Sequence, residues 1–350
     1  MNTAVTTPDP RLHAFIAGLP KAELHVHIEG TLEPELIFEL AARNRINLPY
    51  GSVQELQNAY AFTDLQSFLD LYYAAASVLI TERDFYDMTM AYLQRAQNDG
   101  VVHTEIMFDP QTHTARGVCM QTVFAGISRA LRETQQSSGM SGYLIMSFLR
   151  HLSEDEAFET LDAALPLREQ YQDLWIAIGL DSAERGNPPE KFMRLFKRCK
   201  DLGFRLVAHA GEEGPAAYVR DTLNLLSVDR IDHGVRSEED PVLMQRLIAE
   251  QIPLTVCPLS NLKLRVIDTM NQHNVARLLR RGAMVTINSD DPAYFGGYVA
   301  ENYMAVALAL NLNRQELTTL AKNSLTASFL PATQKQILLN QLEACAKAMT

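Results

Sequence analysis

The chain has 350 residues, of which 47% are hydrophobic and 21% are charged. This is an ordinary globular composition, and the length suffices to bury a sizeable core. With 31 Lys and Arg against 42 Asp and Glu, the net charge of −11 argues against nucleic-acid binding as a main activity, because neutralising phosphates requires clustered Lys and Arg.

Secretion and membrane insertion are also disfavoured. Residues 1–10 have neither the basic segment nor the apolar stretch of a signal peptide, and no run approaches the roughly 20 apolar residues of a membrane helix. The cysteines, Cys119, Cys199, Cys257 and Cys345, form no closely spaced pair, which favours reduced thiols. We therefore expect a cytoplasmic protein that binds neither nucleic acid nor membranes.

Eight short apolar runs, each ending in polar or ionisable residues, predict β-strands. In chain order they are residues 22–28, 101–108, 143–149, 174–180, 205–208, 230–231, 252–256 and 283–288. Most of these runs are continuous rather than alternating, as in parallel strands that are covered on both faces.

The segments between the runs predict helices. Residues 29–100 contain three helical patterns, at 34–43, 65–79 and 84–97, and form an elaborated first connection. Further along, Asp240 followed by Pro241 predicts a helix N-cap and first turn. From the fourth run onward the strands recur every roughly 24–32 residues, the size of a βα unit.

This order of elements predicts an α/β fold, a (β/α)8 barrel with a helical first βα connection. A doubly wound open sheet is the alternative, and it also places ligands at the carboxyl ends of strands. The barrel is favoured because ionisable residues end both the first and the last run, and closure brings those ends together. No linker-like stretch divides the chain, so residues 1–350 are expected to form a single domain.

Histidines gather at several of these predicted strand ends. His25 and His27 are two residues apart in one strand, so both imidazoles face the same side. His209 ends another strand within the string HAGEEG, where Glu212 follows, and His233 lies in the string IDHG. Taken singly, each of these residues also has a structural explanation at the barrel rim.

Asp290 and Asp291 directly follow the last predicted strand. Adjacent carboxylates repel one another and are tolerated easily only at the surface or beside a cation. Pro292 disfavours the α conformation at Asp291, so the two side chains are expected to diverge, one toward a metal and the other toward a substrate.

Three histidines and one carboxylate from the first, fifth and eighth strands would therefore converge on one face. This ligand set suits Zn²⁺ with a position left for water, and iron or manganese remain open alternatives. Glu212 and His233 are left as acid and base candidates. The residues together predict metal-assisted addition of water to an electrophilic carbon.

The strings PKAELHVHIEGTLEPE, LDSAE, VAHAGEEG, RIDHG, CPLSN and VTINSDDP resemble those of the adenosine/adenine deaminase family of amidohydrolase-type barrels. They extend from Pro20 to about Glu301, most of the chain. Two further strings, FDPQTHT and CPLSNLKL, are most similar to the branch that acts on free adenine.

The resemblance implies one Zn²⁺ per chain, bound by His25, His27, His209 and Asp290. It implies that Glu212 protonates the purine ring nitrogen beside the attacked carbon. It also implies that His233 orients the attacking water and helps to take its proton, and that Asp291 holds the ring nitrogen N7.

Two positions depart from the adenosine-acting pattern. Glu29 stands where adenosine deaminases generally have the Asp that contacts ribose, and Glu184 replaces a glycine whose backbone faces the purine. We expect Glu29 to reach into the ribose space or to make a different contact, and the Glu184 side chain to lie beside the base. Both changes are compatible with a smaller ligand that lacks ribose.

The leading hypothesis is therefore zinc-dependent deamination of adenine to hypoxanthine and ammonia in purine salvage, with a small-molecule purine as partner. The alternative within the family is an adenosine deaminase. Outside it, a non-catalytic purine-binding barrel and a metal hydrolase acting on an amide or ester remain open.

Overall fold

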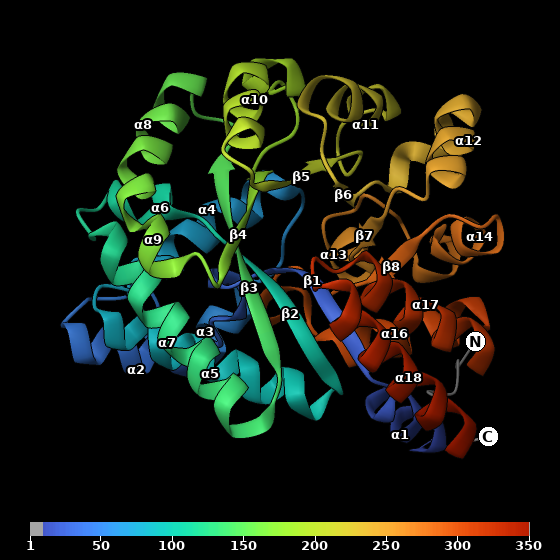
Figure 1. The fold of residues 1–350 in the computed structure, drawn as a ribbon. Helices are drawn as coiled ribbons and strands as arrows, with labels where there is room; N and C mark the ends of the chain where they lie inside the picture. The colour runs from blue at the N-terminus through green and yellow to red at the C-terminus, as the bar shows by residue number, and fades with distance from the viewer. Residues whose placement is uncertain (1–9, 350) are drawn as a thin grey trace.

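A computed structural model describes residues 10–349, so the expectation of no signal peptide falls largely outside the described part of the chain. Eight parallel strands pair in the order β1 to β8 and form a barrel that helices surround (Figure 1). The strands are β1 (Lys21–His27), β2 (Val101–Phe108), β3 (Ser141–Leu149), β4 (Trp175–Asp181), β5 (Arg205–Ala210), β6 (Arg230–His233), β7 (Leu254–Val256) and β8 (Val285–Ile287). The predicted fold class is confirmed.

The barrel closes where β8 meets β1. The N–H of His27 donates to the carbonyl of Asp290 at 2.9 Å, and the N–H of Asp290 donates to the carbonyl of His25 at 3.1 Å. These bonds flank a parallel bridge between Val26 and Asp290. Closure thus brings the first and last strand ends together, which an open sheet does not do.

The first connection is helical, as predicted, and one of its helices, α4 (Leu65–Ala76), lines the cavity at the carboxyl ends of the strands. It consists of η1 (Glu29–Thr31), α2 (Pro34–Asn44), α3 (Val53–Asn58), α4 (Leu65–Ala76) and α5 (Glu82–Asn98). Asp64 is the N-cap of α4, and its carboxylate accepts a hydrogen bond from the N–H of Ser67 at 2.9 Å.

The other connections carry the remaining helices. They are α6 (Pro110–Thr114), α7 (Met120–Ser138), α8 (Glu154–Ala164), η2 (Leu165–Leu167), α9 (Arg168–Tyr171), η3 (Pro189–Phe192), α10 (Met193–Asp201), α11 (Ala216–Asp221), η4 (Thr222–Leu226), η5 (Val235–Glu239), α12 (Pro241–Glu250), α13 (Pro258–Lys263), η6 (Met270–Gln272) and α14 (Val275–Arg280). As the sequence predicted, Asp240 caps α12, and its carboxylate accepts from the N–H groups of Val242 and Leu243.

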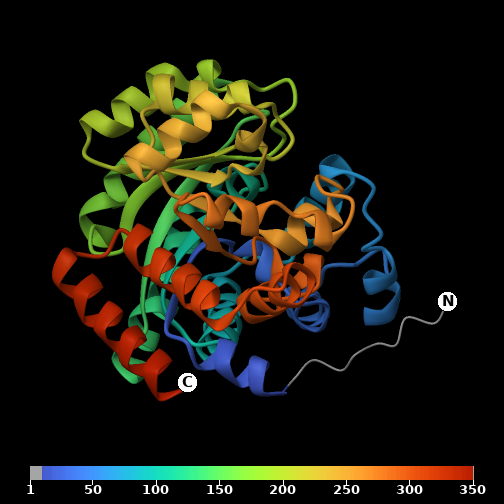
Figure 2. The same cartoon turned by 90° about the vertical axis from the view of Figure 1, so that its right-hand side faces the viewer.

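The two ends of the described chain lie together. After β8 come α15 (Pro292–Phe295), α16 (Val299–Leu310), α17 (Arg314–Ala327) and α18 (Ala332–Ala348), and α1 (Pro10–Gly18) precedes β1. Both views place α1 beside the end of α18 (Figures 1 and 2), and the Cys345 thiol donates to the carbonyl of Gly18 at 3.1 Å.

The strand faces explain where the site forms. In β1 every second residue is apolar and packs outward, whereas Lys21, Glu23, His25 and His27 share the opposite face, so this strand alternates. A small apolar cluster of Met107, Ile145, Ala177 and Val207 comes from the neighbouring strands β2 to β5. Asp109 and His209 each lie two residues after a member of this cluster, and Asp181 lies four residues after Ala177, so they share its face of the strands and stand on packed apolar side chains.

Candidate active site

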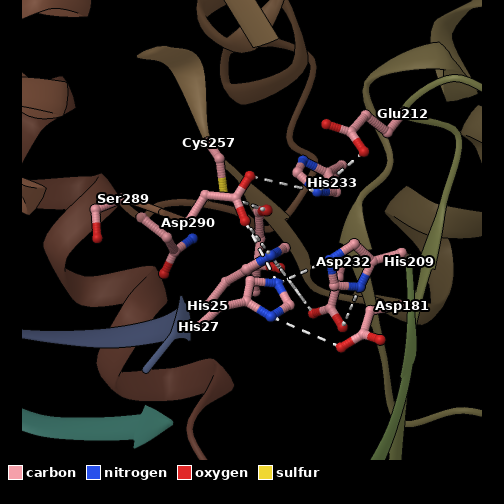
Figure 3. A network of polar contacts seen from close by, with 12 residues as sticks. His25, His27, Asp181, His209, Glu212, Asp232, His233, Cys257, Ser289 and Asp290 are labelled. Carbon is pink, nitrogen blue, oxygen red and sulfur yellow. Dashed lines mark hydrogen bonds and ion pairs between the residues drawn. The ribbon is translucent and has the colours of Figure 1, made fainter. Parts of the chain in front are cut away.

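Four predicted ligands meet at the carboxyl end of the barrel (Figure 3). His25 and His27 come from β1, His209 from β5, and Asp290 follows β8. Their potential ligand atoms all lie within 4.8 Å of one another, and none of the four residues is more than 7% exposed. Asp290 Oδ1 lies 3.1 Å from His25 Nε2 and 3.5 Å from His27 Nε2.

The Nδ1 atom of each ligand histidine, on the side of the ring away from the cluster, faces an oxygen of another side chain. His25 Nδ1 lies 3.0 Å from the Thr255 hydroxyl, which itself donates to Asp232 at 2.8 Å, so the hydroxyl accepts from His25. His209 Nδ1 lies 3.7 Å from Asp232, and His27 Nδ1 lies 3.7 Å from Asp181. Such partners orient metal-binding histidines and leave the Nε2 lone pair free.

This arrangement fits a cation. With hydrogens on their Nδ1 atoms, His27 and His209 turn two Nε2 lone pairs toward each other across 3.2 Å. A shared positive ion relieves that repulsion. Three imidazoles and one carboxylate are the ligands that Zn²⁺ takes in catalytic sites.

The backbone is strained at two positions of the site. His233 has a φ of 62° and Asp290 a φ of 65°, in the left-handed region that residues other than glycine seldom adopt. Such conformations cost about 1–3 kcal/mol each and cluster at functional sites. The strained conformations let His233, the last residue of β6, and Asp290, three residues after the end of β8, face the same centre.

Glu212 and His233 lie beside the ligand cluster. Glu212 Oε2 is 3.6 Å from His233 Nε2, which is 3.8 Å from Asp290 Oδ2. Burial, together with the negative charges of Asp290, Glu184 and Glu213, holds the pKa of Glu212 well above its usual range. Its Oε1 has no hydrogen-bond partner, so one oxygen of this carboxyl group is free to meet a ligand in the site.

A relay of hydrogen bonds determines which His233 nitrogen carries hydrogen. The N–H of Val275 donates to His273 Nδ1 at 3.1 Å, so His273 Nε2 donates to the Asn261 oxygen at 3.3 Å. The Asn261 amide nitrogen then donates to His233 Nδ1 at 3.4 Å. Burial, aided by His25 and His27, lowers the pKa of His233 to about 3, so its neutral ring presents an Nε2–H to the site.

Asp291 lies next to Asp290 but makes different contacts. Its Oδ1 has no partner, and burial followed by the charge of Asp290 holds its pKa well above the usual range. A Cβ at Gly30 would lie 1.9 Å from Asp291 Oδ1 and 2.7 Å from its Cα. Glycine at this position therefore lets η1 pack against the Asp291 backbone.

The Glu184 side chain does not lie where the sequence suggested. Its carboxylate accepts four backbone N–H bonds, from Gly211 (2.8 Å), Glu212 (3.1 Å), Glu213 (3.0 Å) and Gly214 (2.8 Å). The expectation of a side chain beside the base is wrong, because these four donors hold the carboxylate against the turn after β5. Glu184 thus positions the backbone that carries Glu212.

Glu29 is also held by protein groups. Its Oε1 accepts from His113 Nε2 at 2.7 Å and from the N–H of Asp109 at 3.3 Å, and the Tyr72 hydroxyl lies 3.4 Å from its Oε2. Arg116 donates to the other nitrogen of His113 at 2.9 Å, which fixes the direction of the pair. Glu29 is 1% exposed and lies behind Asp109.

A narrow cavity opens onto the ligand cluster. Residues of α4 form its apolar wall, and the described residues that line it are His27, Leu65, Phe68, Leu69, Tyr72, Tyr73, Asp109, Asp181, Ser182, His209, Glu212, His233, Leu264, Asp290 and Asp291. The lining includes Asp109 and Asp181, the residues that directly follow the predicted apolar runs at 101–108 and 174–180.

None of the helices formed by residues 10–349 is both long enough and apolar enough to cross a lipid bilayer.

Comparisons with known proteins cover nearly the whole chain. A sequence model of the adenosine deaminase family matches residues 20–345. An adenine deaminase from Acinetobacter baylyi is 58% identical over 328 residues, 94% of this chain and 98% of that protein.

Solved structures agree with the fold. An adenine deaminase from Arthrobacter aurescens superposes with a TM-score of 0.91 at 53% identity, covering 94% of this chain and 99% of that one. An amidohydrolase from Burkholderia ambifaria, solved with bound zinc, superposes with a TM-score of 0.88 at 24% identity, covering 99% and 97% of the two chains.

Proposed function

The chain belongs to the adenosine deaminase family, and from that premise we propose that it is an adenine deaminase, which hydrolyses adenine to hypoxanthine and ammonia in purine salvage. The observation that carries the proposal is the small cavity beside the His/Asp cluster, with the unpaired carboxyl groups of Glu212 and Asp291 in its wall. Its partner is a small-molecule purine.

We propose that His25, His27, His209 and Asp290 hold one zinc ion per chain. The convergence of their ligand atoms and the facing Nε2 lone pairs support this assignment. Zinc bound there supplies Lewis-acid activation of the attacking water.

Glu212 is the proposed general acid. Neutral adenine is a poor electrophile, and protonation of the ring nitrogen beside C6 makes that carbon reactive toward water. A carboxyl group whose pKa is raised by burial is suited to deliver this proton. The four backbone bonds that Glu184 accepts hold the turn on which Glu212 stands.

His233 and Asp291 are proposed to orient the reactants. The relay through Asn261 leaves hydrogen on His233 Nε2, so this ring orients the water by donating to its oxygen. This tautomer favours orientation over the expected uptake of the water's proton. Asp291 is proposed to bind N7 of the purine through its unpaired Oδ1.

We also propose a domain organisation, a cellular compartment and roles for Glu29 and Glu184. Residues 1–350 form one metal-dependent deaminase domain in a cytoplasmic enzyme. Glu29 and Glu184 act by positioning Asp109 and Glu212 respectively, rather than by contacting the substrate through their own carboxylates.

The proposal is tested by comparing adenine, adenosine and N6-substituted adenines as substrates of the zinc-loaded protein. Ammonia release and the change in purine absorbance measure turnover. We expect kcat/KM to be far higher for adenine than for adenosine. Faster hydrolysis of adenosine would make the protein an adenosine deaminase, and no turnover of any purine would refute the proposal.

A further inference from the structure

Asp109 is a cavity residue that the reaction described above leaves without a role. It follows β2, lies 3% exposed in the cavity wall, and its Oδ1 has no hydrogen-bond partner. It precedes α6, but its side chain does not cap that helix. The neighbouring Asp181 carboxyl group offers no donor when it is ionised, and an unsatisfied buried carboxyl oxygen costs stability, so a ligand that donates a hydrogen bond would relieve this cost.

The surroundings hold this carboxyl group in one place. The Tyr72 hydroxyl lies 3.4 Å from Asp109 Oδ2, and the N–H of Asp109 donates to Glu29, which His113 fixes in turn. A group held through both its backbone and one oxygen can present the other oxygen to a ligand in a defined direction.

The position of Asp109 relative to the residues proposed to bind the purine indicates which purine atom lies beside the Asp109 carboxyl group. The Tyr72 hydroxyl lies near the carboxylates of both Asp109 and Glu29. Gly30, which follows Glu29 in the chain, packs against Asp291. Asp109 therefore lies near the proposed N7 contact, and its other neighbours are His27 and Asp181, with ligand atoms within 4.8 Å. In a purine, N9 is the nitrogen that follows N7 across C8, on the edge away from C6.

We infer that Asp109 accepts a hydrogen bond from the N9–H of the bound base and thereby selects the free base over purines substituted at N9. The inference rests on the proposed function. Free adenine has a hydrogen on N9, whereas a nucleoside has carbon there. A substituted purine would leave the buried Asp109 oxygen unpaired and crowd it, and sites built to bind a substrate N–H reject analogues that lack it.

The test compares adenine with 9-methyladenine, which blocks N9 with the smallest carbon group. In the wild type we expect kcat/KM to be far higher for adenine. Asp109→Ala should lower kcat/KM for adenine by roughly ten- to hundredfold, while the value for 9-methyladenine stays constant or rises because the methyl group gains space. The ratio of kcat/KM for adenine to kcat/KM for 9-methyladenine should therefore fall sharply in this variant.

Two further variants separate recognition from structure. Asp109→Asn keeps the volume and an accepting oxygen, so it should retain more of the preference than Asp109→Ala. Ser182→Ala alters the same cavity at a hydroxyl that already pairs with Tyr73 and His151, and it should leave the ratio unchanged. Zinc content and thermal unfolding verify that each variant is folded and loaded.

The outcomes are distinguishable. If Asp109→Ala lowers kcat/KM equally for both substrates, or for neither, the inference is wrong, even though the protein remains an adenine deaminase. If the wild type releases no ammonia from adenine, the proposed function itself fails.

Discussion

Glu212 is a buried carboxyl group with one unpaired oxygen, and its environment favours the protonated form. The same property that suits it to be an acid makes its ionised form costly to the fold. Because its pKa is raised in the folded state, the proton it holds stabilises the fold fully below the unfolded pKa. That contribution is lost as pH rises through the folded pKa.

We therefore predict two effects of Glu212→Gln. Turnover of adenine should fall by roughly 10²- to 10⁴-fold, because glutamine cannot donate the proton, while zinc content is unchanged. Metal-depleted variant protein should also melt higher than metal-depleted wild type at neutral and alkaline pH, and the difference should shrink toward acid pH. Steady-state kinetics, metal analysis and thermal unfolding check these effects, and turnover close to wild type would contradict the acid role.

Asp232 is the second residue-scale feature, since it faces two of the proposed zinc ligands. We predict that Asp232→Asn weakens zinc affinity roughly 10- to 100-fold, because it disturbs the partners of His25 and His209. Competition with a chelator measures the affinity, and excess zinc should restore much of the activity. The exposed Asp173→Asn is the control, and unchanged affinity in Asp232→Asn would refute the orienting role.

Sequence reasoning predicted the residues that end strands and could not predict those that support them. His25 and His27 were recognisable because alternate residues of a strand share a face. Thr255 lies within an apolar run and Asp232 stands beside a more conspicuous histidine, so neither carried a pattern of its own. The role of Glu184 depends on how the turn after β5 folds back, which spacing along the chain does not encode.

At the scale of elements, the close packing of η1 on the start of α15 positions Asp291. We predict that Gly30→Ala lowers kcat/KM for adenine by at least tenfold, because the new Cβ would require Asp291 to shift. In the control Gly51→Ala, the new Cβ would meet only the end of the Glu55 side chain, at 3.3 Å. Kinetics and unfolding of both variants check the prediction, and full activity in Gly30→Ala would contradict it.

Helices whose apolar residues recur at helical spacing could be predicted from the sequence. Strand ends and cavity walls, which depend on contacts between distant segments, could not. The patterns at 34–43, 65–79 and 84–97 correspond to α2, α4 and α5. The run at 205–208 extends to Ala210, because pairing with β6 continues through His209 and Ala210. That α4 supplies the cavity wall could not be predicted, since its apolar face is also what a helix packed in the core would show.

At the scale of the whole molecule, the seam of the barrel passes through the proposed metal ligands. The backbone groups of His25, His27 and Asp290 make the bonds that join β8 to β1, and their side chains converge beside that seam. We therefore expect metal binding and barrel closure to be coupled.

We predict that removing zinc lowers the thermal stability of the entire barrel rather than of a local loop. A ligand present at a hundred times its Kd stabilises the native state by about 2.7 kcal/mol. Thermal unfolding with and without chelator measures the shift, and amide hydrogen exchange locates it. If exchange increased only in the turn after β5, the coupling through the seam would be refuted.

The charges of the cavity lining also favour uncharged ligands over anionic ones. Among the described residues that form it, four carboxyl groups, Asp109, Asp181, Glu212 and Asp291, surround the space beside Asp290, and none is Lys or Arg. A phosphate group brought into such a space would lose its hydration and, apart from the proposed zinc ion, meet only negative or neutral side chains. Nucleotides should therefore be excluded by repulsion before their shape is tested. The enzyme would then act on uncharged bases and leave phosphorylated adenine compounds untouched.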